Sequence, residues 1–420
     1  MTLNKQIPHD KALDSSLAFI KEGYLFIKNR VDHFQSDLFV ARFFGKQVIC
    51  MSGKDAAMVF YDTEKFQRRG SVPKWIQKSF LGVKSVQLLD GKTHLDRKKN
   101  LLSIITPSDE KQIGEMVMQH WQALVSEDKQ NIVLFEEAKI LLCRVACEWA
   151  GVPMKESEVK GRAEDFISII DSFGAIGPRN WKGRKARQRV ENWLSAMIED
   201  IRSSRVTVRE DSPLYRIITT KNINGQSFSN KTAAVHLISI LKSIVAISIF
   251  VTFAALALHK NPDCIPKLKT KDPLFLDWFT QEVRRFYPFA PLTGAKAKKD
   301  FTWNNYHFKE GMLVLLDLYG TNQDERIWKN PDQFIPERFK DWEANLFDFI
   351  PQGGGELATG HRCPGEGITV EVIKASVDFL VNCVEYDVPK QDLSYSLARM
   401  PLIPKSGFVI SDVKNKYIVH

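Results

Sequence analysis

Apolar residues recur at three- and four-residue spacing through most of the chain, the pattern of helices packed on one face. Short alternating patterns, typical of strands, occur near the start and in the last third. No Gly/Ser-rich linker, repeat or low-complexity tract divides the sequence. We therefore predict a mainly α fold with a small β portion, in a single domain over residues 1–420. The predicted helices are 13–34, 111–125, 131–150, 156–173 and 185–204, and the predicted strands are 37–44, 47–51, 296–303, 312–318 and 407–411.

The longest predicted helix, residues 231–260, is apolar nearly all round and should run through the core. Its most apolar segment, residues 244–258, is short for a membrane span. The adjacent pair Lys242 and Ser243 makes the sharpest break in this apolar surface. Because the first residues also lack the apolar core of a signal peptide, the sequence predicts a cytoplasmic protein without a membrane span.

Composition excludes wholesale disorder and gives little support to nucleic-acid binding. Hydrophobic residues make up 44% of the chain and charged residues 26%, with a net charge of +9. The densest basic run, 182–189, has no interleaved aromatic residues, so a basic face for an acidic protein or an anionic small molecule fits equally well. The six cysteines form no CxxC pair, and Cys143 and Cys147 are interpreted as two buried thiols rather than a metal pair.

Three segments carry candidate chemistry. A Gly-rich loop in residues 349–366 delivers Cys363 to the start of a helix predicted over 367–380, where backbone amides stabilise a thiolate. Glycines in that loop would allow close approach to a flat partner. Upstream, Glu282 and Arg285 are three apart on one helical face, the spacing of an ion pair. Arg338 follows in the segment Pro-Glu-Arg-Phe.

The order, spacing and type of these three motifs resemble the cytochrome P450 family over essentially the whole chain. The resemblance implies the P450 fold and a haem b cofactor whose iron takes the Cys363 thiolate as axial ligand. It also implies that Glu282, Arg285 and Arg338 brace the thiolate loop.

Within that family, the chain is similar to the bacterial fatty-acid peroxygenases. The similarity rests on Gln352, the three glycines and the lengthened loop 356–360 before Cys363, and on segments 90–97, 286–289 and 317–321. In that group hydrogen peroxide is the oxidant, so no redox partner is expected. The resemblance implies hydroxylation of long-chain fatty acids at the alpha or beta carbon.

The distal proton relay usual in P450 monooxygenases is missing. Residues 235–258 contain Thr252 but no Asp or Glu, so a substrate carboxylate is expected to assist O–O cleavage as general acid–base. Where the peroxygenases carry Arg-Pro, this chain has Lys242-Ser243. An ammonium binds a carboxylate as a point charge, whereas a guanidinium grips it with two bonds. We predict that Lys242 anchors the carboxylate; the alternatives are a snorkelling or neutral lysine, or a role with another substrate.

Gln87 matches a distal residue that is His in decarboxylating relatives and Gln in hydroxylating ones. Because an amide cannot donate a proton as imidazolium does, hydroxylation is favoured; alternatively, Gln87 only bonds the pocket wall. The catalytic candidates are therefore Lys242, Gln87 and Ser243. By the same resemblance His94 and Lys98, which share a helical face, bind the haem together with Arg68, Lys296 and Gln352, whereas Arg97 faces elsewhere. The candidate pocket residues are Leu81, Phe289, Leu292 and Ser172.

Other functions remain open at this point. A peroxide-driven decarboxylase would form terminal alkenes from fatty acids. A reductase-dependent monooxygenase would need NAD(P)H and a redox partner. A haem- or lipid-binding protein with little turnover would follow if the loss of the Arg removed carboxylate binding.

Overall fold

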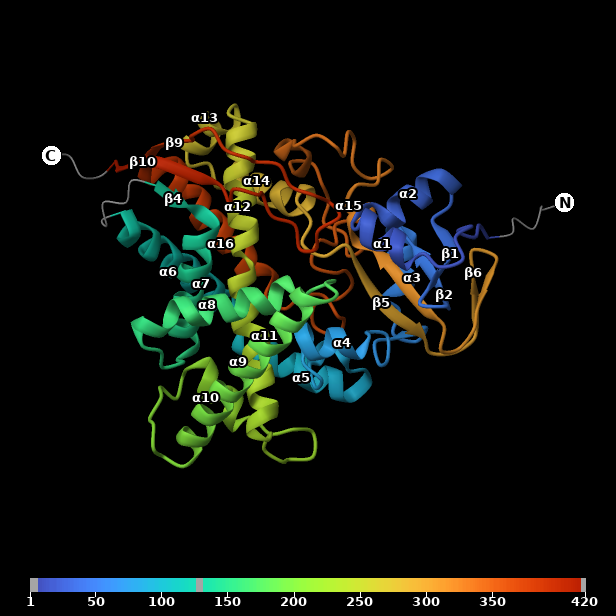
Figure 1. Ribbon diagram of the computed structural model, residues 1–420, viewed down its shortest axis with the longest axis horizontal. Helices are drawn as coiled ribbons and strands as arrows, with labels where there is room; N and C mark the ends of the chain where they lie inside the picture. The colour runs from blue at the N-terminus through green and yellow to red at the C-terminus, as the bar shows by residue number, and fades with distance from the viewer. Residues whose placement is uncertain (1–6, 126–130, 417–420) are drawn as a thin grey trace.

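The computed structural model describes residues 7–125 and 131–416. Helices form the larger part of the molecule, and a β-rich part lies at the side that holds the N-terminus (Figure 1). Helix accounts for 52% of the chain and strand for 12%, which confirms a mainly α fold with a small β portion. Residues 1–6, which belong to the segment searched for a signal peptide, lie outside the described residues.

The helices range from single turns to the 25 residues of α9. The bounds of the helices are α1 Ser16–Glu22, α2 Leu25–Phe34, α3 Lys54–Phe60, α4 Lys74–Ile76, α5 Gly91–Ile104, α6 Pro107–Val125, α7 Leu134–Ala150, α8 Glu156–Asp171, α9 Pro178–Arg202, α10 Pro213–Thr219, α11 Asn230–Ala246, α12 Ser248–Lys260, α13 Cys264–Lys269, α14 Pro273–Phe286, α15 Leu318–Asn322 and α16 Glu366–Asp378. Short 3-10 or π-helical turns are η1 Gln77–Leu81, η2 Val86–Leu88, η3 Pro336–Phe339 and η4 Phe379–Cys383.

Three sheets make up the β portion. The largest has the strand order β1-β2-β8-β5-β3, with β2 and β8 parallel and the other pairs antiparallel. A second sheet has the order β4-β10-β9, and β6 and β7 form a hairpin. The strands are β1 Leu38–Phe43, β2 Lys46–Met51, β3 Phe66–Gln67, β4 Asn131–Val133, β5 Leu292–Ala297, β6 Phe301–Trp303, β7 Tyr306–Phe308, β8 Leu313–Asp317, β9 Val384–Asp387 and β10 Val409–Asn415.

Two predicted helices differ from the structure at their N-terminal halves. The helix predicted over 13–34 is two helices, because Gly23 has φ 57° and a Cβ there would lie 2.2 Å from the carbonyl oxygen of Leu397. The helix predicted over 131–150 begins with strand β4, since Ile132 pairs with Ile410 of β10. Tertiary pairing overrides the helical pattern there.

Further boundaries were wrong: α6 begins at Pro107 rather than residue 111, and β10 covers Val409–Asn415 rather than 407–411. Helix α9 starts at Pro178 rather than residue 185, with proline at the position where its missing N–H costs nothing. The strand predicted over 296–303 is the end of β5 followed by β6, separated by three charged residues. The helix predicted over 231–260 breaks at Ile247, where the Ser248 hydroxyl donates to the Val245 carbonyl at 2.8 Å and tightens the turn.

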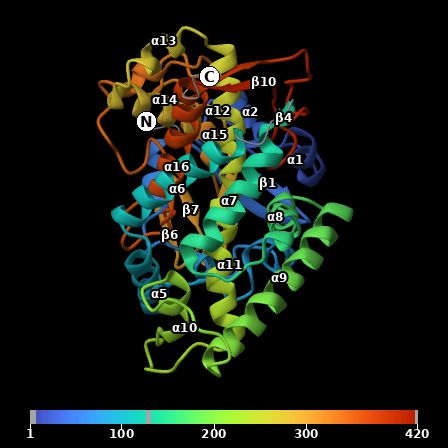
Figure 2. The ribbon, with the colours of Figure 1, turned by 90° about the vertical axis from the view of Figure 1, so that its left-hand side faces the viewer.

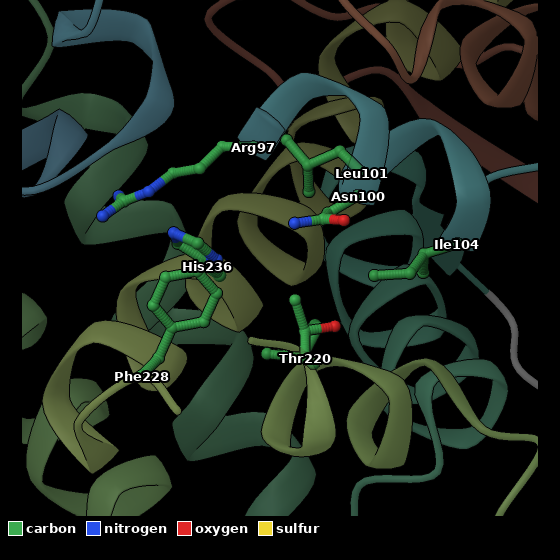
Figure 3. A pocket seen from close by; sticks show the side chains of 8 residues that line it. Arg97, Asn100, Leu101, Ile104, Thr220, Phe228 and His236 are labelled. Carbon is green, nitrogen blue, oxygen red and sulfur yellow. The ribbon is translucent and has the colours of Figure 1, made fainter. Parts of the chain in front are cut away.

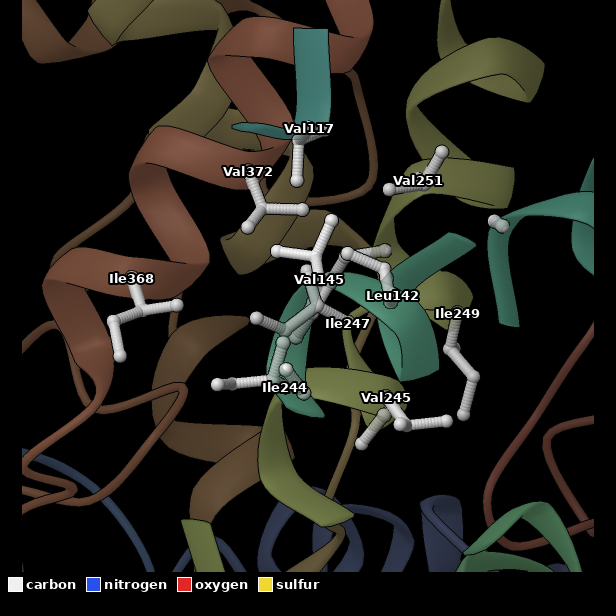
Figure 4. Packing of buried hydrophobic residues seen from close by; sticks show 14 of the residues in the cluster. Val117, Leu142, Val145, Ile244, Val245, Ile247, Ile249, Val251, Ile368 and Val372 are labelled. Carbon is white, nitrogen blue, oxygen red and sulfur yellow. The ribbon is translucent and has the colours of Figure 1, made fainter. Parts of the chain in front are cut away.

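The core lies around α11 and α12, which together run through the length of the helical part (Figures 1 and 2). Ile244 and Val245 of α11 pack with Val145 of α7 and Val372 of α16 (Figure 4). Among the described residues, one helical run, Asn230–Lys260, is long and apolar enough to cross a membrane, and 89% of its most apolar window is buried in the fold. This burial is what a core helix requires.

Helix α14 brings the polar motif of the sequence into the interior. It begins at Pro273, where the Asp272 side chain caps the N–H of Leu274. Phe275, Phe279 and Val283 are buried at four-residue spacing, which fixes this face against the core. The last turn therefore carries its glutamate and two arginines into buried positions.

Candidate thiolate site

Cys363 lies in the loop that leads into α16, three residues before the helix begins. Its N–H donates to the carbonyl of Gln352 at 3.1 Å. Burial raises the pKa of the Cys363 thiol, whereas a hydrogen bond from the Gly365 N–H and the charges of Lys98 and Arg284 lower it. The other five cysteines are buried, whereas the Cys363 residue is partly exposed.

The two thiols of α7 have no such exposure. Cys143 and Cys147 are both free and buried, which confirms the interpretation as core thiols. Within the described residues, no group of three or more His, Cys, Asp or Glu side chains is arranged to hold a metal ion. Among the cysteines of the chain, Cys363 is therefore the candidate ligand.

The three glycines before Cys363 let the loop lie close to Tyr61. A Cβ on Gly354 would lie 2.9 Å from the Tyr61 ring and 2.7 Å from Ile350, and Gly353 and Gly355 have φ of 93° and 79°. No larger residue fits this approach. The Tyr61 ring, directly after α3, lies against these glycines, so they shape the loop there; their approach to a bound flat group stays a prediction.

Arg284 ties the thiolate loop to α14. Its Nε donates to Oε1 of Gln352 at 3.2 Å, and its Nη2 donates to Glu366 at the start of α16. The Gln352 amide donates in turn to the Thr369 hydroxyl at 3.0 Å. Glu366 also accepts from Arg362 at 2.6 Å. The Gln352 side chain is therefore hydrogen-bonded within the loop, and its contact with a haem stays a prediction.

Replacing Arg284 with methionine is expected to loosen the thiolate loop. The change removes a charged donor from Glu366 and from Gln352, at a cost of about 1–3 kcal/mol. We expect the haem absorbance of the loaded protein to be lost at a lower temperature than in the wild type. Arg189→Met, at a side chain that is 55% exposed, is the control. If Arg284→Met and the wild type lost their haem absorbance at the same temperature, Arg284 would not brace the loop.

The predicted Glu-x-x-Arg pair is confirmed. Arg285 and Glu282 form two charged hydrogen bonds, at 2.7 and 2.8 Å, and both side chains are fully buried. Arg338 adds a third bond to Glu282 at 3.1 Å. Arg285 also donates to the carbonyl of Asn322 at 3.0 Å, and the Asn322 side chain accepts from the N–H of Ile350 at 2.9 Å. This triad reaches the thiolate loop through Asn322.

Four basic side chains gather beside the thiolate loop. His94 is buried, as is Lys98 one turn later, which confirms that they share a face. The His94 ring stacks on His361 at 4.0 Å between centroids, and the Lys98 ammonium donates to the carbonyl of Arg362. Arg68 donates to the carbonyl of Gly294 at 2.7 Å. His361 was not identified from the sequence.

Burial lowers the pKa values of these four groups, and repulsion between neighbours adds to the effect for the two histidines. Burial, together with Lys98, lowers the pKa of His94 to about 4, and burial lowers the pKa of Lys98 to about 8. Burial and Arg68 lower the pKa of His361. One carboxylate, Asp90, lies 4.0 Å from His361. A thiol beside two buried cations, Arg68 and Lys98, and two neutral imidazoles fits a haem, whose iron takes the thiolate and whose propionates are anions.

Lys242 is buried in α11, where its side chain contacts Phe80. Its Nζ donates to the carbonyl of Phe80 at 3.1 Å and lies 3.7 Å from the centroid of the Phe80 ring. Burial and the charge of Arg187 lower the pKa of Lys242 to about 7, against the effect of Cys363, which raises it. Lys242 is 5% exposed, so its ammonium does not reach the solvent and the snorkelling alternative is wrong.

Ser243 and Gln87 are exposed although their neighbours are buried. Ser243 follows buried Lys242 in the core helix, and its hydroxyl donates to the Ser239 carbonyl at 2.7 Å. Gln87 lies in η2 between two buried residues. Thr252, in contrast, is fully buried and donates to the Ser248 carbonyl at 2.8 Å, so its hydroxyl is held within α12.

The other predicted residues divide into accessible and packed groups. Lys296, Leu81 and Phe289 are half-buried, and the Phe289 ring lies 6.3 Å from that of Phe250. Leu292 packs against the apolar cluster under α2. Ser172 is fully buried and donates to the Ile169 carbonyl at 2.7 Å, so it packs between α8 and α9 and does not line open space.

A small pocket lies elsewhere, between α5, α10 and α11 (Figure 3). Arg97 lines it and donates to the carbonyl of Lys84 at 2.6 Å, which confirms that Arg97 faces away from His94 and Lys98. His236 lines it too, with its pKa lowered to about 4 by burial. Its Nε2 has no hydrogen-bond partner in the described chain, which suits a bound water.

Comparison with known proteins identifies a family and several solved structures with a similar fold. A model of the family Cytochrome P450 matches residues 165–375. The structure of cytochrome P450EX alpha (CYP152N1) with myristic acid is 40% identical, covers 98% of this chain and 100% of that chain, and superposes with a TM-score of 0.95. A phenylalanine-to-alanine variant of cytochrome P450 OleT in complex with arachidonic acid is 34% identical, covers 99% of both chains and has a TM-score of 0.95. Taxoid 14-beta-hydroxylase of Taxus cuspidata is 24% identical over 96% of this chain and 87% of its own length.

Proposed function

This chain belongs to the cytochrome P450 family, and we propose that it is a haem-thiolate peroxygenase that hydroxylates long-chain fatty acids with hydrogen peroxide. Two solved relatives that cover the chain almost completely carry the fatty acids myristic acid and arachidonic acid. The observation that carries the proposal is the buried side chain of Lys242, which bonds the Phe80 carbonyl on a helical run without acidic residues.

In this proposal Cys363 holds the haem iron, and Arg68, His94, Lys98 and Lys296 hold its propionates. When bound, the haem supplies the oxidising chemistry, and a thiolate ligand favours O–O cleavage. The chain's own part is to keep the thiolate in place. Gly365 does this by donating its N–H to the sulfur.

Lys242 binds the carboxylate of the fatty acid. A buried ammonium with one carbonyl and one ring as partners gains from a full counter-charge. The carboxylate oxygen then takes up the peroxide proton and returns it, as an Asp or Glu would. Thr252 cannot replace it, because its hydroxyl is bonded within the helix.

Gln87 favours hydroxylation over decarboxylation. Its side chain is exposed in η2, and an amide offers hydrogen bonds but no titrating proton near neutral pH. With the carboxylate fixed at Lys242, the carbons next to it are held nearest to the reacting centre. The expected product is therefore an alpha- or beta-hydroxy acid.

The product test uses the haem-loaded protein, hydrogen peroxide and a mixed-length fatty-acid panel, without reductase. Hydroxy acids identified by mass spectrometry would support the proposal, and alkenes one carbon shorter would show a decarboxylase. Product formation that needs NAD(P)H and a reductase would show a monooxygenase. No lipid product with the haem intact would contradict the assignment of fatty acids as substrate.

Fatty-acid binding is expected to weaken as the pH rises above about 7. Burial and Arg187 lower the Lys242 pKa to about 7, and only the protonated ammonium attracts a carboxylate. Each further pH unit should therefore cost up to about tenfold in affinity. Calorimetric titration of decanoate from about pH 6 to about pH 9 measures this. Lys242→Arg, which stays charged, should give a flat profile; the same slope in both proteins would contradict the role of Lys242.

A further inference from the structure

Two buried cations share one carbonyl oxygen next to the proposed carboxylate site. The Phe80 carbonyl accepts from Lys242 at 3.1 Å and from Nη1 of Arg187 at 3.0 Å. Arg187 lies on α9, within the basic run 182–189. The two residues are 5% and 2% exposed, so water screens their repulsion little.

The Arg187 guanidinium is only partly satisfied. Its Nε donates to Glu191 at 2.7 Å, but its buried Nη2 has no hydrogen-bond partner in the described part of the chain. A Cβ on Gly82 would lie 2.3 Å from Nη2, so the glycine makes room for this arm. Burial lowers the pKa of Arg187, and the charge of Arg187 in turn contributes to lowering the pKa of Lys242.

A carbonyl oxygen in a protein needs one good donor, and a second cation on the same oxygen adds repulsion and desolvation cost. The hydrogen bond from Arg187 is enough to satisfy the Phe80 carbonyl without Lys242. The ammonium of Lys242 therefore loses little when it leaves this oxygen for another acceptor. Without Arg187, the same movement would leave a buried carbonyl unpaired.

We propose that Arg187 is a positioning residue that keeps Lys242 available for the substrate carboxylate. It retains the Phe80 carbonyl when the ammonium turns to the acid, and its charge weakens the hold of Lys242 on that carbonyl. This inference rests on the proposed function, because it assigns the occupant of Lys242 as a carboxylate. It explains how a lysine serves where the similar peroxygenases carry an arginine.

The experiment compares an acid with an alcohol of the same length in the haem-loaded protein. Decanoate and decan-1-ol are titrated by calorimetry at about pH 6, where Lys242 is charged. In Arg187→Met, we expect the Kd of decanoate to rise by about tenfold while that of the alcohol is unchanged. Arg187→Lys, which keeps a charged donor, should recover most of the acid affinity, and the exposed Arg189→Met should match the wild type.

Unequal changes for the two ligands separate this role from simple packing. If Arg187→Met weakens acid and alcohol equally, or leaves the acid unchanged, the inference is wrong. If Arg187→Met does not fold, Arg187→Lys still tests the inference. Equal weakening of acid and alcohol binding in Arg187→Lys, relative to the wild type, would overturn the positioning role. If the wild type binds neither decanoate nor myristate, the proposed function itself fails, and the inference with it.

Discussion

Lys242→Met should reduce peroxide-driven turnover of fatty acids by about a hundredfold or more, the contribution typical of a positioned acid–base group. Methionine fills the space of the lysine stem but carries no charge. The fatty-acid carboxylate would then lose its only proposed anchor on a helix whose described residues contain no Asp or Glu. Initial rates of hydroxy-acid formation against peroxide concentration measure the effect.

Two matched variants make that result interpretable. Lys242→Arg keeps the charge and should retain activity or tighten carboxylate binding, because a guanidinium offers two parallel donors. Ser239→Ala, on the same helix, removes a hydroxyl that donates to the Val235 carbonyl and should have a small effect. Unchanged turnover in Lys242→Met, with the haem spectrum intact, would disprove the anchoring role.

Glu282→Gln is expected to destabilise the fold by about 3–5 kcal/mol, because it leaves two guanidinium groups buried without a counter-charge. Arg285 is fully buried beside Glu282, and Arg338 reaches the same carboxylate. An amide keeps the shape of the side chain but loses the charge. Urea denaturation followed by circular dichroism measures the change in the free energy of unfolding.

The control for this variant is an exposed glutamate with a single cationic partner. Glu337 pairs with Lys267, and its side chain is 43% exposed. Glu337→Gln should cost less than about 1 kcal/mol, as surface pairs do. A loss of similar size in both variants would show that the Glu282 triad is not the main brace of this region.

Features that could be predicted from the sequence are mostly local. The bond between Glu282 and Arg285 joins residues one helical turn apart, and the burial of His94 and Lys98 on one face follows from their spacing. Cys363 was identified by the loop in which it stands. In each of these cases the relevant partners are close in sequence, or belong to a motif that resembles a known family.

Features that were missed depend on distant parts of the chain. Arg187 and Lys242 meet at Phe80, which is 107 residues from the first and 162 from the second. Arg284 stands next to Arg285, but only the packing of α14 turns it toward the thiolate loop, 68 residues away. The signal available was a second arginine beside a single glutamate, which suggested another partner. Spacing alone did not say which one.

The same distinction explains the errors in secondary structure. The break at Ile247 follows from a serine that bonds back to its own helix, whereas β4 exists only because β10 pairs with it. A periodic pattern reports which face is buried, not where a pairing partner will end the helix.

The most direct test of the account compares a long-chain fatty acid with its methyl ester in the wild-type, haem-loaded protein with hydrogen peroxide alone. Chain length and apolar contacts are nearly the same, but the ester has no charge for Lys242 to bind and no carboxylate to move a proton. The account predicts hydroxylated acid and a turnover of the ester lower by about a hundredfold or more. Equal turnover of acid and ester would contradict it.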